Sequence, residues 1–258
     1  MKQLWEKWRP AFSTLVAAYI FFWSISGLET HEVNFAETIP RAGKIFGLMI
    51  TDFDWPYMGD LILKLKDTVQ MAILGTLLAA LLAVPFGFLA AQNIVKRFSG
   101  VGKFLLSAIR TFPEVILAIV FIRGVGPGPL AGIFAMGIHS IGMLGKLYAE
   151  AIEAIDRGPV EALTSTGANR VQQIWFAVIP QVLPEFASYA LYRFEINSRA
   201  AAVLGVVGAG GIGAPLLFAI QRPAWGRVGI ILAGIIVVVS LIDIGSGWLR
   251  RKLEFRMR

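Results

Sequence analysis

The chain has 258 residues, of which 56% are hydrophobic and 16% charged, and its mean hydropathy is +0.68. Soluble globular domains have about 45–50% apolar and about 25% charged residues, so this composition argues against a soluble enzyme or nucleic-acid-binding domain and for a protein of the membrane. The chain has no cysteine, which excludes disulfides, thiolate metal sites and cysteine nucleophiles, and in a membrane protein the placement of the net charge of +7 matters more than its sum.

The first apolar stretch, residues 11–28, follows the basic residues Lys2, Lys7 and Arg9. A cleavable signal peptide is the alternative to a membrane anchor at such a position. The stretch is longer than a typical signal core, and no small-x-small cleavage site follows it closely. We therefore expect a retained anchor helix.

Charge-poor stretches of about 20 residues predict the membrane spans, since a helix of that length crosses the hydrocarbon core. We expect six spans in one all-α polytopic membrane helical bundle over residues 1–258, at residues 11–28, 68–95, 104–122, 129–149, 181–207 and 228–249. The region 171–221 is ambiguous, because it could hold two spans split near residues 193–199. Residues 29–66 form the longest outer segment, in which residues 36–50 are either an amphipathic surface helix or a loop.

The distribution of basic residues predicts the orientation. The last nine residues contain five basic ones: Arg250, Arg251, Lys252, Arg256 and Arg258. The positive-inside rule places them in the cytoplasm together with the basic N-terminus. Both termini on one side require an even number of spans, which favours six over seven. The loop between the second and third expected spans, with Lys96, Arg97 and Lys103, then also lies inside.

The loop at residues 150–180 has the most distinctive pattern. Gly158-Pro159 ends one helix and starts another, since proline fits the first helical turn. Glu161 then lies in that first turn, where the helix dipole favours an acid, and Gly167 suits a left-handed helix end. A second short helix follows, and Pro180 marks its boundary. The pattern predicts a helix–turn–helix elbow on the cytoplasmic face.

Within this elbow, Glu161-Ala162-Leu163, then Gly167, then Ile179-Pro180 resembles the Glu-Ala-Ala…Gly…Leu-Pro loop of ABC importer permeases. Leu163 replaces the second alanine and Ile179 the leucine of that pattern, and both keep its apolar character. In that family the loop forms coupling helices that dock into a groove of the ATPase subunit. The resemblance therefore implies that the residues for ATPase coupling are Gly158, Glu161, Ala162, Gly167 and Pro180. An ordinary amphipathic loop is the alternative.

A second resemblance extends over the C-terminal half. Residues 158–161, 166–169, 180–184, 188–195 and 203–213 are similar to the phosphonate-type permeases. The resemblance implies a type I ABC importer fold in a bacterial inner membrane. It also implies a homodimer of the permease, two ATPase subunits that hold ATP and Mg, and one extracytoplasmic binding protein. Phosphonate is the expected substrate, and phosphite, hypophosphite and, less closely, methionine or nitrate are the alternatives within the class.

Two motifs test other activities. Gly208-x-Gly210-x-x-Gly213 matches a dinucleotide-binding fingerprint, but that motif needs a βαβ unit and an acid about 20 residues further on. We therefore expect close helix packing or a Gly-rich bend near the outer mouth. No Gly-Lys pair is followed by Ser or Thr, so the phosphate-binding loop of ATPases is missing. We expect no enzyme, no cofactor and no metal on this chain, with ATP hydrolysis on a separate subunit.

Charged residues inside spans normally face a bundle interior or a pathway. The candidates for a substrate pathway are Arg110, His139, Arg193, Glu195, Asn197 and Arg199. Guanidinium groups match a phosphorus oxyanion with paired donors. The alternative is structural pairing of Arg110 with Glu114, and of Arg193 or Arg199 with Glu195. A packing role is favoured for the histidine, because one histidine makes no metal site.

Two other classes of protein remain to be weighed. An ion-gradient-driven secondary transporter predicts inverted repeats and functional acids in the membrane, and no repeat is visible in the sequence. An intramembrane enzyme needs a catalytic constellation, which no set of residues here supplies. An ATP-driven importer that works by alternating access is therefore favoured.

Overall fold

The computed structural model describes residues 2–27 and 35–254, and within these ranges every regular element is helical. The chain divides into two compact units, Met1–Gly47 and Leu48–Arg258, each of which is described by itself. The expectation of one permease domain over residues 1–258 stays a prediction.

The first unit contains helix α1 (Lys2–Ser26) and most of α2 (Phe35–Thr51). The apolar part of α1, Phe12–Ser26, is shorter than a typical span and covers most of the first predicted one. For residues 36–50 the sequence was compatible with either a surface helix or a loop, and the structure has a helix there. On α2, Arg41 and Glu37 form an exposed ion pair of 2.7 Å one turn apart.

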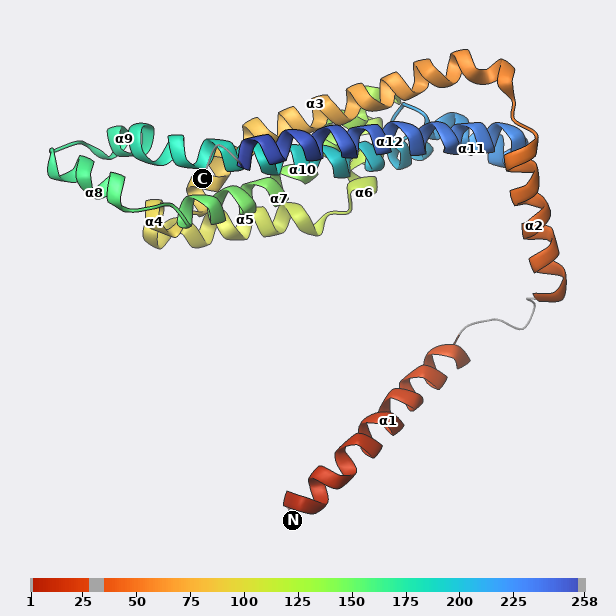
Figure 1. The fold of residues 1–258 in the computed structure, drawn as a ribbon, viewed down its shortest axis with the longest axis horizontal. Coiled ribbons are helices and arrows are strands. Elements are labelled where there is room, and N and C mark those ends of the chain that lie inside the picture. The colour runs from red at the N-terminus through yellow and green to blue at the C-terminus, as the bar shows by residue number, and fades with distance from the viewer. Residues whose placement is uncertain (1, 28–34, 255–258) are drawn as a thin grey trace. The chain divides into compact units, whose positions relative to one another are not determined.

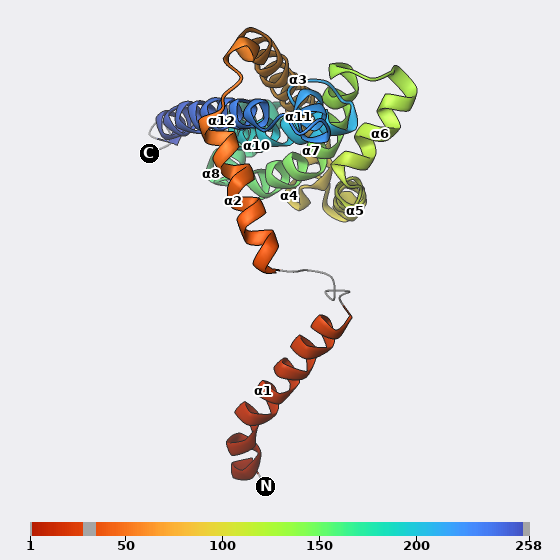
Figure 2. The same cartoon turned by 90° about the vertical axis from the view of Figure 1, so that its right-hand side faces the viewer.

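The second unit is a bundle whose central helix is α7. Its long helices are α3 (Met58–Ala90), α5 (Ser99–Thr111), α6 (Glu114–Val125), α7 (Pro129–Glu153), α10 (Ile179–Leu204) and α12 (Trp225–Glu254). Helix α7 packs against α3, α5, α6 and α10, and α12 packs against α10 and α3. Figure 1 shows α3, α7, α10 and α12 side by side, and in Figure 2 α12 lies on the other side of α7 from α5 and α6.

Short elements connect these helices. They are the 3₁₀ turns at Trp55–Tyr57, Lys96–Phe98 and Gly205–Val207, the helices α4 (Gln92–Val95), α8 (Gly158–Ser165), α9 (Arg170–Gln173) and α11 (Gly213–Gln221), and a π-helical turn at Ile174–Val178. Helices α8 and α9 project from one end of the bundle (Figure 1). The connections of the bundle are therefore short except at this end.

Four stretches of the described residues are long and apolar enough to cross a membrane: Trp55–Ala90, Pro129–Glu153, Arg170–Val207 and Trp225–Leu253. The bent pair Gln92–Thr111 and Glu114–Val125 is a fifth if it is counted as one span. The predicted all-α polytopic bundle is confirmed. The described residues contain four or five such spans, so the prediction of six holds only approximately.

The third predicted span, residues 104–122, is not one continuous helix. Helices α5 and α6 meet at an angle of 81°. Phe112 and Pro113 between them have extended backbone, with ψ of 121° and 134°. Proline disfavours a helical conformation of the residue before it and has no N–H for the helical ladder. Pro113 therefore breaks the predicted span.

The predicted bounds of the second span, residues 68–95, lie further along the chain than those of the helix in the structure, Met58–Ala90. Helix α3 starts at Met58, so the last part of the predicted outer segment 29–66 is the first part of this helix. Charged residues made that part look like a loop, but Lys64 and Asp67 pair at 3.3 Å along the helix surface. The helix ends at Ala90, because Ala91 is extended with ψ of 120°.

The fifth span has no break near residues 193–199. Helix α10 runs unbroken through them, and the apolar stretch extends from Arg170 to Val207. Pro180 lies in the first turn of α10, where its missing N–H weakens the ladder, and the preceding turn widens into a π-helix. The predicted helix boundary at this proline is therefore a local widening of a continuing helix.

The segment at residues 205–213 is a bend that packs closely. Gly208 and Gly210 have φ of +95° and +86°. The N–H of Ile212 donates to the Thr68 hydroxyl on α3 at 2.9 Å, and a side chain at Gly210 would meet Pro129 at the start of α7. The glycines of the rejected dinucleotide motif thus make the Gly-rich bend that the sequence predicts.

Small residues form much of the bundle core, as in other membrane helix pairs. Ala79, Ala83 and Ala90 of α3 are fully buried. A Cβ at Gly102 of α5 would lie 2.7 Å from the backbone of Leu89 and Ala90. Glycine at this position therefore allows α5 to touch the end of α3 directly.

We expect Gly102→Leu to destabilise the bundle by about 1–3 kcal/mol or more, because backbone cannot yield as a flexible side chain does. The measurement is the melting temperature of the purified protein in detergent. Gly100→Leu is the matched control, since Gly100 lies on the same helix and a Cβ there has nothing within 4 Å. Equal melting temperatures of the two variants would contradict the close contact.

Candidate functional site: an elbow and a buried polar cluster

The elbow starts at helix α8. Its first N–H, of Gly158, donates to the carboxylate of Asp156 at 2.9 Å, and Pro159 occupies the first turn. Glu161 lies in that turn and is exposed, as are Gly158 and Ala162. The helix break and the acid in the first turn are thus where the sequence predicts them.

The turn after α8 depends on Gly167, which has φ of +80°. Its N–H donates to the carbonyl of Thr164, and the N–H of Ala168 donates to that of Leu163, both at 3.0 Å. These bonds satisfy the last carbonyls of the helix, and the left-handed conformation favours glycine. A Cβ at Gly167 would have nothing within 4 Å, so this glycine marks an open point of the turn.

Two polar residues that the sequence reading did not single out shape the rest of the elbow. Asn169 caps α9 in a reciprocal capping box with Gln172, at 2.9 and 3.0 Å. The side chain of Gln181 accepts from the N–H of Asp156 at 3.0 Å and donates to its carbonyl at 3.3 Å. The Asn-x-x-Gln spacing was visible in the sequence, whereas the bridge from Gln181 joins residues 25 apart and was not.

The outer surface of the elbow is apolar as well as polar. Val171, Trp175 and Phe176 are 74%, 64% and 67% exposed. Exposed apolar groups that lie together with a polar rim indicate a surface for a partner or for lipid. Because Gln181 ties both ends of the elbow at Asp156, this surface is held as one unit at the end of the bundle.

A buried polar cluster lies between α3, α7 and α10. The guanidinium of Arg193, whose residue is 5% exposed, donates to the Ser140 hydroxyl at 2.8 Å and contacts the sulfur of Met143 at 3.3 Å. The Asn197 amide donates to Thr76 at 2.9 Å and to Ser140 at 3.2 Å. Two of the predicted pathway residues, Arg193 and Asn197, therefore share one site.

Glu114 supplies the negative charge at this cluster. Its carboxylate lies 3.9 Å from Arg193 Nη2, and neither Glu114 Oε1 nor Arg193 Nη2 has a hydrogen-bond partner among the residues described. The pairing of Arg110 with Glu114, which the sequence left as the alternative to a pathway role, is not formed, because the break at Pro113 separates their helices and removes the one-turn geometry. The cluster thus keeps one donor and one acceptor unused.

His139 stabilises the break itself. Its Nδ1–H donates to the carbonyl of Phe112 at 3.2 Å, so it satisfies a backbone group that α5 and α6 leave open. This contact agrees with the packing role that the sequence favours. Through it, α7 holds the bend next to Arg193.

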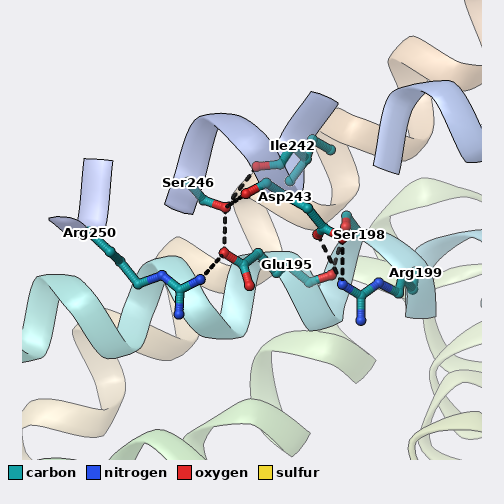
Figure 3. A network of polar contacts seen from close by, with 7 residues as sticks. All are labelled: Glu195, Ser198, Arg199, Ile242, Asp243, Ser246 and Arg250. Atoms are coloured by element: carbon teal, nitrogen blue, oxygen red, sulfur yellow. Dashed lines mark hydrogen bonds and ion pairs between the residues drawn. The ribbon is translucent and has the colours of Figure 1, made fainter. Parts of the chain in front are cut away.

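Glu195 and Arg199 face the other way, toward α12 (Figure 3). Glu195 accepts from Ser246 at 2.5 Å and from Arg250 at 2.7 Å, and Arg199 donates to both carboxylate oxygens of Asp243 at 2.8–2.9 Å. The alternative pairing of Arg193 or Arg199 with Glu195 is not formed: Arg199 pairs with Asp243, and Glu195 with Arg250. Residues two apart on a helix lie on opposite faces, so 193 and 197 face α7 while 195 and 199 face α12.

Arg110 lies apart from both groups. It is exposed on α5 and has no ion pair or hydrogen bond within the described part of the chain. It lines a cavity of about 330 Å³ between α5 and α7. The six predicted pathway residues thus occupy three places: the buried cluster with its neighbouring His139, the contact with α12, and this cavity.

Comparison with known proteins decides the family. The family described as "Binding-protein-dependent transport system inner membrane component" matches residues 83–258. The chain belongs to this family. The matched range contains the whole elbow and all of the buried cluster except Thr76.

Curated relatives narrow the family of this permease. It is 45% identical over 192 residues to the phosphite transport system permease protein PtxC of Stutzerimonas stutzeri, covering 74% of this chain and 70% of the relative. It is 41% identical to the phosphate-import permease protein PhnE of Mycolicibacterium smegmatis, covering 72% of this chain and 36% of that one. The permease is therefore an ABC importer permease of the phosphonate family.

Solved structures show the fold of the permease. A chain of the inward-facing MetNI methionine ABC transporter superposes with a TM-score of 0.67 at 21% identity, covering 78% of the permease and 99% of that chain. A chain of a bacterial alginate ABC transporter superposes with a TM-score of 0.59 at 17% identity, covering 97% and 99%. The predicted type I ABC importer permease fold is confirmed.

Proposed function

We propose that this permease carries a phosphorus oxyanion through the bacterial inner membrane, driven by ATP hydrolysis on separate subunits. The observation that carries the proposal is the elbow, which Gln181 closes at Asp156 and which exposes Gly167 at its turn. The family and the identities with phosphite, phosphate and phosphonate permeases support the same class of substrate.

The elbow is proposed to dock into an ATPase subunit on the cytoplasmic side. Val171, Trp175 and Phe176 supply apolar contact there, and Gly158, Glu161, Ala162, Gly167 and Pro180 supply its backbone shape. Because the elbow continues through a π-helical turn into α10, a movement of the elbow reaches Arg193 along one helix. Two copies of the permease, two ATPases and one extracytoplasmic binding protein complete the transporter in this proposal.

The buried cluster is proposed to face the pathway during transport. Arg193 Nη2 and Glu114 Oε1 have no hydrogen-bond partner among the residues described, and Nη2 lies 3.9 Å from the other carboxylate oxygen, Oε2, as a loose ion pair. An oxyanion that reaches the cluster would replace Glu114 on the guanidinium with a charge-assisted hydrogen bond from Nη2. Weak binding is expected, because substrate must also leave toward the cytoplasm.

The test is ATP hydrolysis by the complex in proteoliposomes, assembled from the permease, a candidate ATPase subunit and a candidate oxyanion-binding protein of the same organism. Methylphosphonate, phosphite and phosphate are compared with methionine and nitrate. Stimulation by one or more phosphorus oxyanions alone is the expected result. Stimulation by methionine or nitrate instead would refute the substrate class, and failure to assemble with an ATPase would refute the coupling.

A further inference from the structure

The cavity between α5 and α7 is lined mainly by charged side chains. Lys103 and Arg110 reach it from α5, and Lys146, Glu150 and Glu153 from α7. Its volume of about 330 Å³ is at the small end of ligand pockets, which span about 300–1,000 Å³. It lies beside the last two turns of α7, at the end of the bundle where the elbow begins.

The charges in this cavity do not cancel. Lys103 pairs with Glu153 at 3.1 Å, and the same carboxylate oxygen accepts from the N–H of Gln92 at 2.8 Å. Lys146 and Glu150 form a looser pair of 3.6 Å with both side chains more than half exposed. Arg110 has no acid of its own among the residues described. The guanidinium of Arg110 therefore has no counter-ion in the described part of the chain, and the ammonium of Lys146 is held only by a weak, exposed pair.

The surroundings of Arg110 place its side chain in the cavity rather than against lipid. Helix α5 rises about 1.5 Å per residue, so Arg110 lies about 16 Å from Ser99 at the elbow end. An arginine that faced lipid at such depth would be energetically unfavourable. A Cβ at Gly142 would lie 2.6 Å from Arg110 Cγ, so this glycine lets the arginine stem lie against α7. The side chain is thus directed along the helix pair and into the cavity.

One face of α7 connects this cavity to the buried cluster. His139, Gly142, Lys146, Glu150 and Glu153 recur at spacings of three or four residues and therefore share that face. His139 holds the bend next to Arg193, and the stripe continues past Arg110 to the elbow end. The cavity and the buried cluster thus lie along the same face of α7. Arg193 does not line the cavity, so the cavity is a second cationic site.

We propose that this cavity binds a phosphorus oxyanion at the elbow end of the permease, with Arg110 and Lys146 as its binding cations. Arg110 offers the planar pair of donors that matches a phosphoryl group, and Lys146 exchanges its loose contact with Glu150 for the anion. The inference rests on the proposed function for the class of anion and for the cytoplasmic side. It assigns the site at which the oxyanion is held before release.

The test is calorimetric titration of the purified permease–ATPase complex in lipid nanodiscs with methylphosphonate, without nucleotide and without binding protein. Saturable binding is expected, weakened about tenfold or more in Arg110→Gln and in Lys146→Gln, because a hydrogen bond to a charged group contributes about 1.5–3 kcal/mol. Arg97→Gln is the matched control: it removes an exposed cation that does not line the cavity. Its affinity should equal that of the wild type.

Three results would overturn the assignment: no saturable binding to the wild type, equal affinity in all four proteins, or binding lost in Arg193→Gln but kept in Arg110→Gln. If sulfate and chloride displaced methylphosphonate as well as phosphite does, the assignment would also be overturned, because the cavity would then bind anions without selectivity. The ATP hydrolysis test is independent of this titration. Stimulated hydrolysis without binding here refutes only the cavity, whereas binding without stimulated hydrolysis refutes only the proposed transport.

Discussion

Gly167→Asp is expected to abolish oxyanion-stimulated ATP hydrolysis while the protein still folds and inserts. Gly167 has φ of +80° and an open Cβ direction at the tip of the elbow. Aspartate and asparagine tolerate the left-handed region better than other residues, so the turn itself survives the change. The loss therefore comes from a side chain placed where a docked ATPase would press against the turn.

The measurement is ATP hydrolysis of the reconstituted complex, with assembly followed by co-purification of the ATPase. A loss of at least about tenfold is expected, which equals about 1.4 kcal/mol of coupling. Gly167→Asn separates bulk from charge, and it should lose coupling too if the contact is close.

Gly100→Asp is the matched control for an added acid. Gly100 is exposed, a Cβ there has nothing within 4 Å, and it lies in the first turn of α5, where the helix dipole favours an acid. This variant should hydrolyse ATP as the wild type does. Normal stimulated hydrolysis in Gly167→Asp would show that the turn does not dock.

The elbow was predictable because its signals are local. Gly158-Pro159, an acid in the next turn and a glycine at the helix end each act within a few residues, and the structure has α8 and the left-handed Gly167 there. The same holds for the glycines of residues 205–213: without a βαβ unit and a following acid they are no nucleotide site, and the sequence favoured close packing or a bend there. Backbone conformations of this kind are determined by residues that are close together in the sequence.

The ion pairs were not predictable in the same way. Arg110 and Glu114 have the spacing of a helical pair, but Pro113 turns the chain by 81° between them, and Glu114 reaches Arg193 instead. Glu195 and Arg199 find Arg250 and Asp243 on α12. Which helix lies beside α10 depends on the packing of the whole bundle. The spacing of residues along one helix carries no information about that neighbour.

The cavity was hidden for the same reason. Arg110 and Lys146 are both charges within predicted spans, but in the structure they lie on helices α5 and α7, which α6 and a loop separate along the chain. Only the close contact at Gly142 brings the two side chains to one cavity. Sequence reasoning therefore found the charges, and tertiary packing assigned their partners.

Arg193→Gln is expected to lower both stability and transport, for two separable reasons. Arg193 and Glu114 have side chains only 6% and 16% exposed, so removing the arginine leaves a carboxylate largely buried without its counter-ion. Breaking a buried pair in this way costs about 3–5 kcal/mol. A low transport rate of this variant alone would therefore not show that Arg193 touches the substrate.

Adding Glu114→Gln resolves the two roles. The double variant has no uncompensated charge, and its melting temperature is expected to return close to that of the wild type. Transport should stay at least about tenfold low, because the guanidinium that we propose to meet the oxyanion is still absent and one such charged contact contributes about 1.5–3 kcal/mol. The measurements are the melting temperature of the assembled complex and uptake of radiolabelled phosphite or methylphosphonate into proteoliposomes.

Arg199→Gln with Asp243→Asn is the matched control on the other face of α10. That pair joins α10 to α12 with side chains 55% and 40% exposed, and exposed pairs contribute only about 0–1 kcal/mol. Its removal should leave transport near the wild-type rate. If instead the Arg193→Gln, Glu114→Gln protein recovers transport together with stability, Arg193 is a structural residue, and the oxyanion takes a route that avoids the buried cluster.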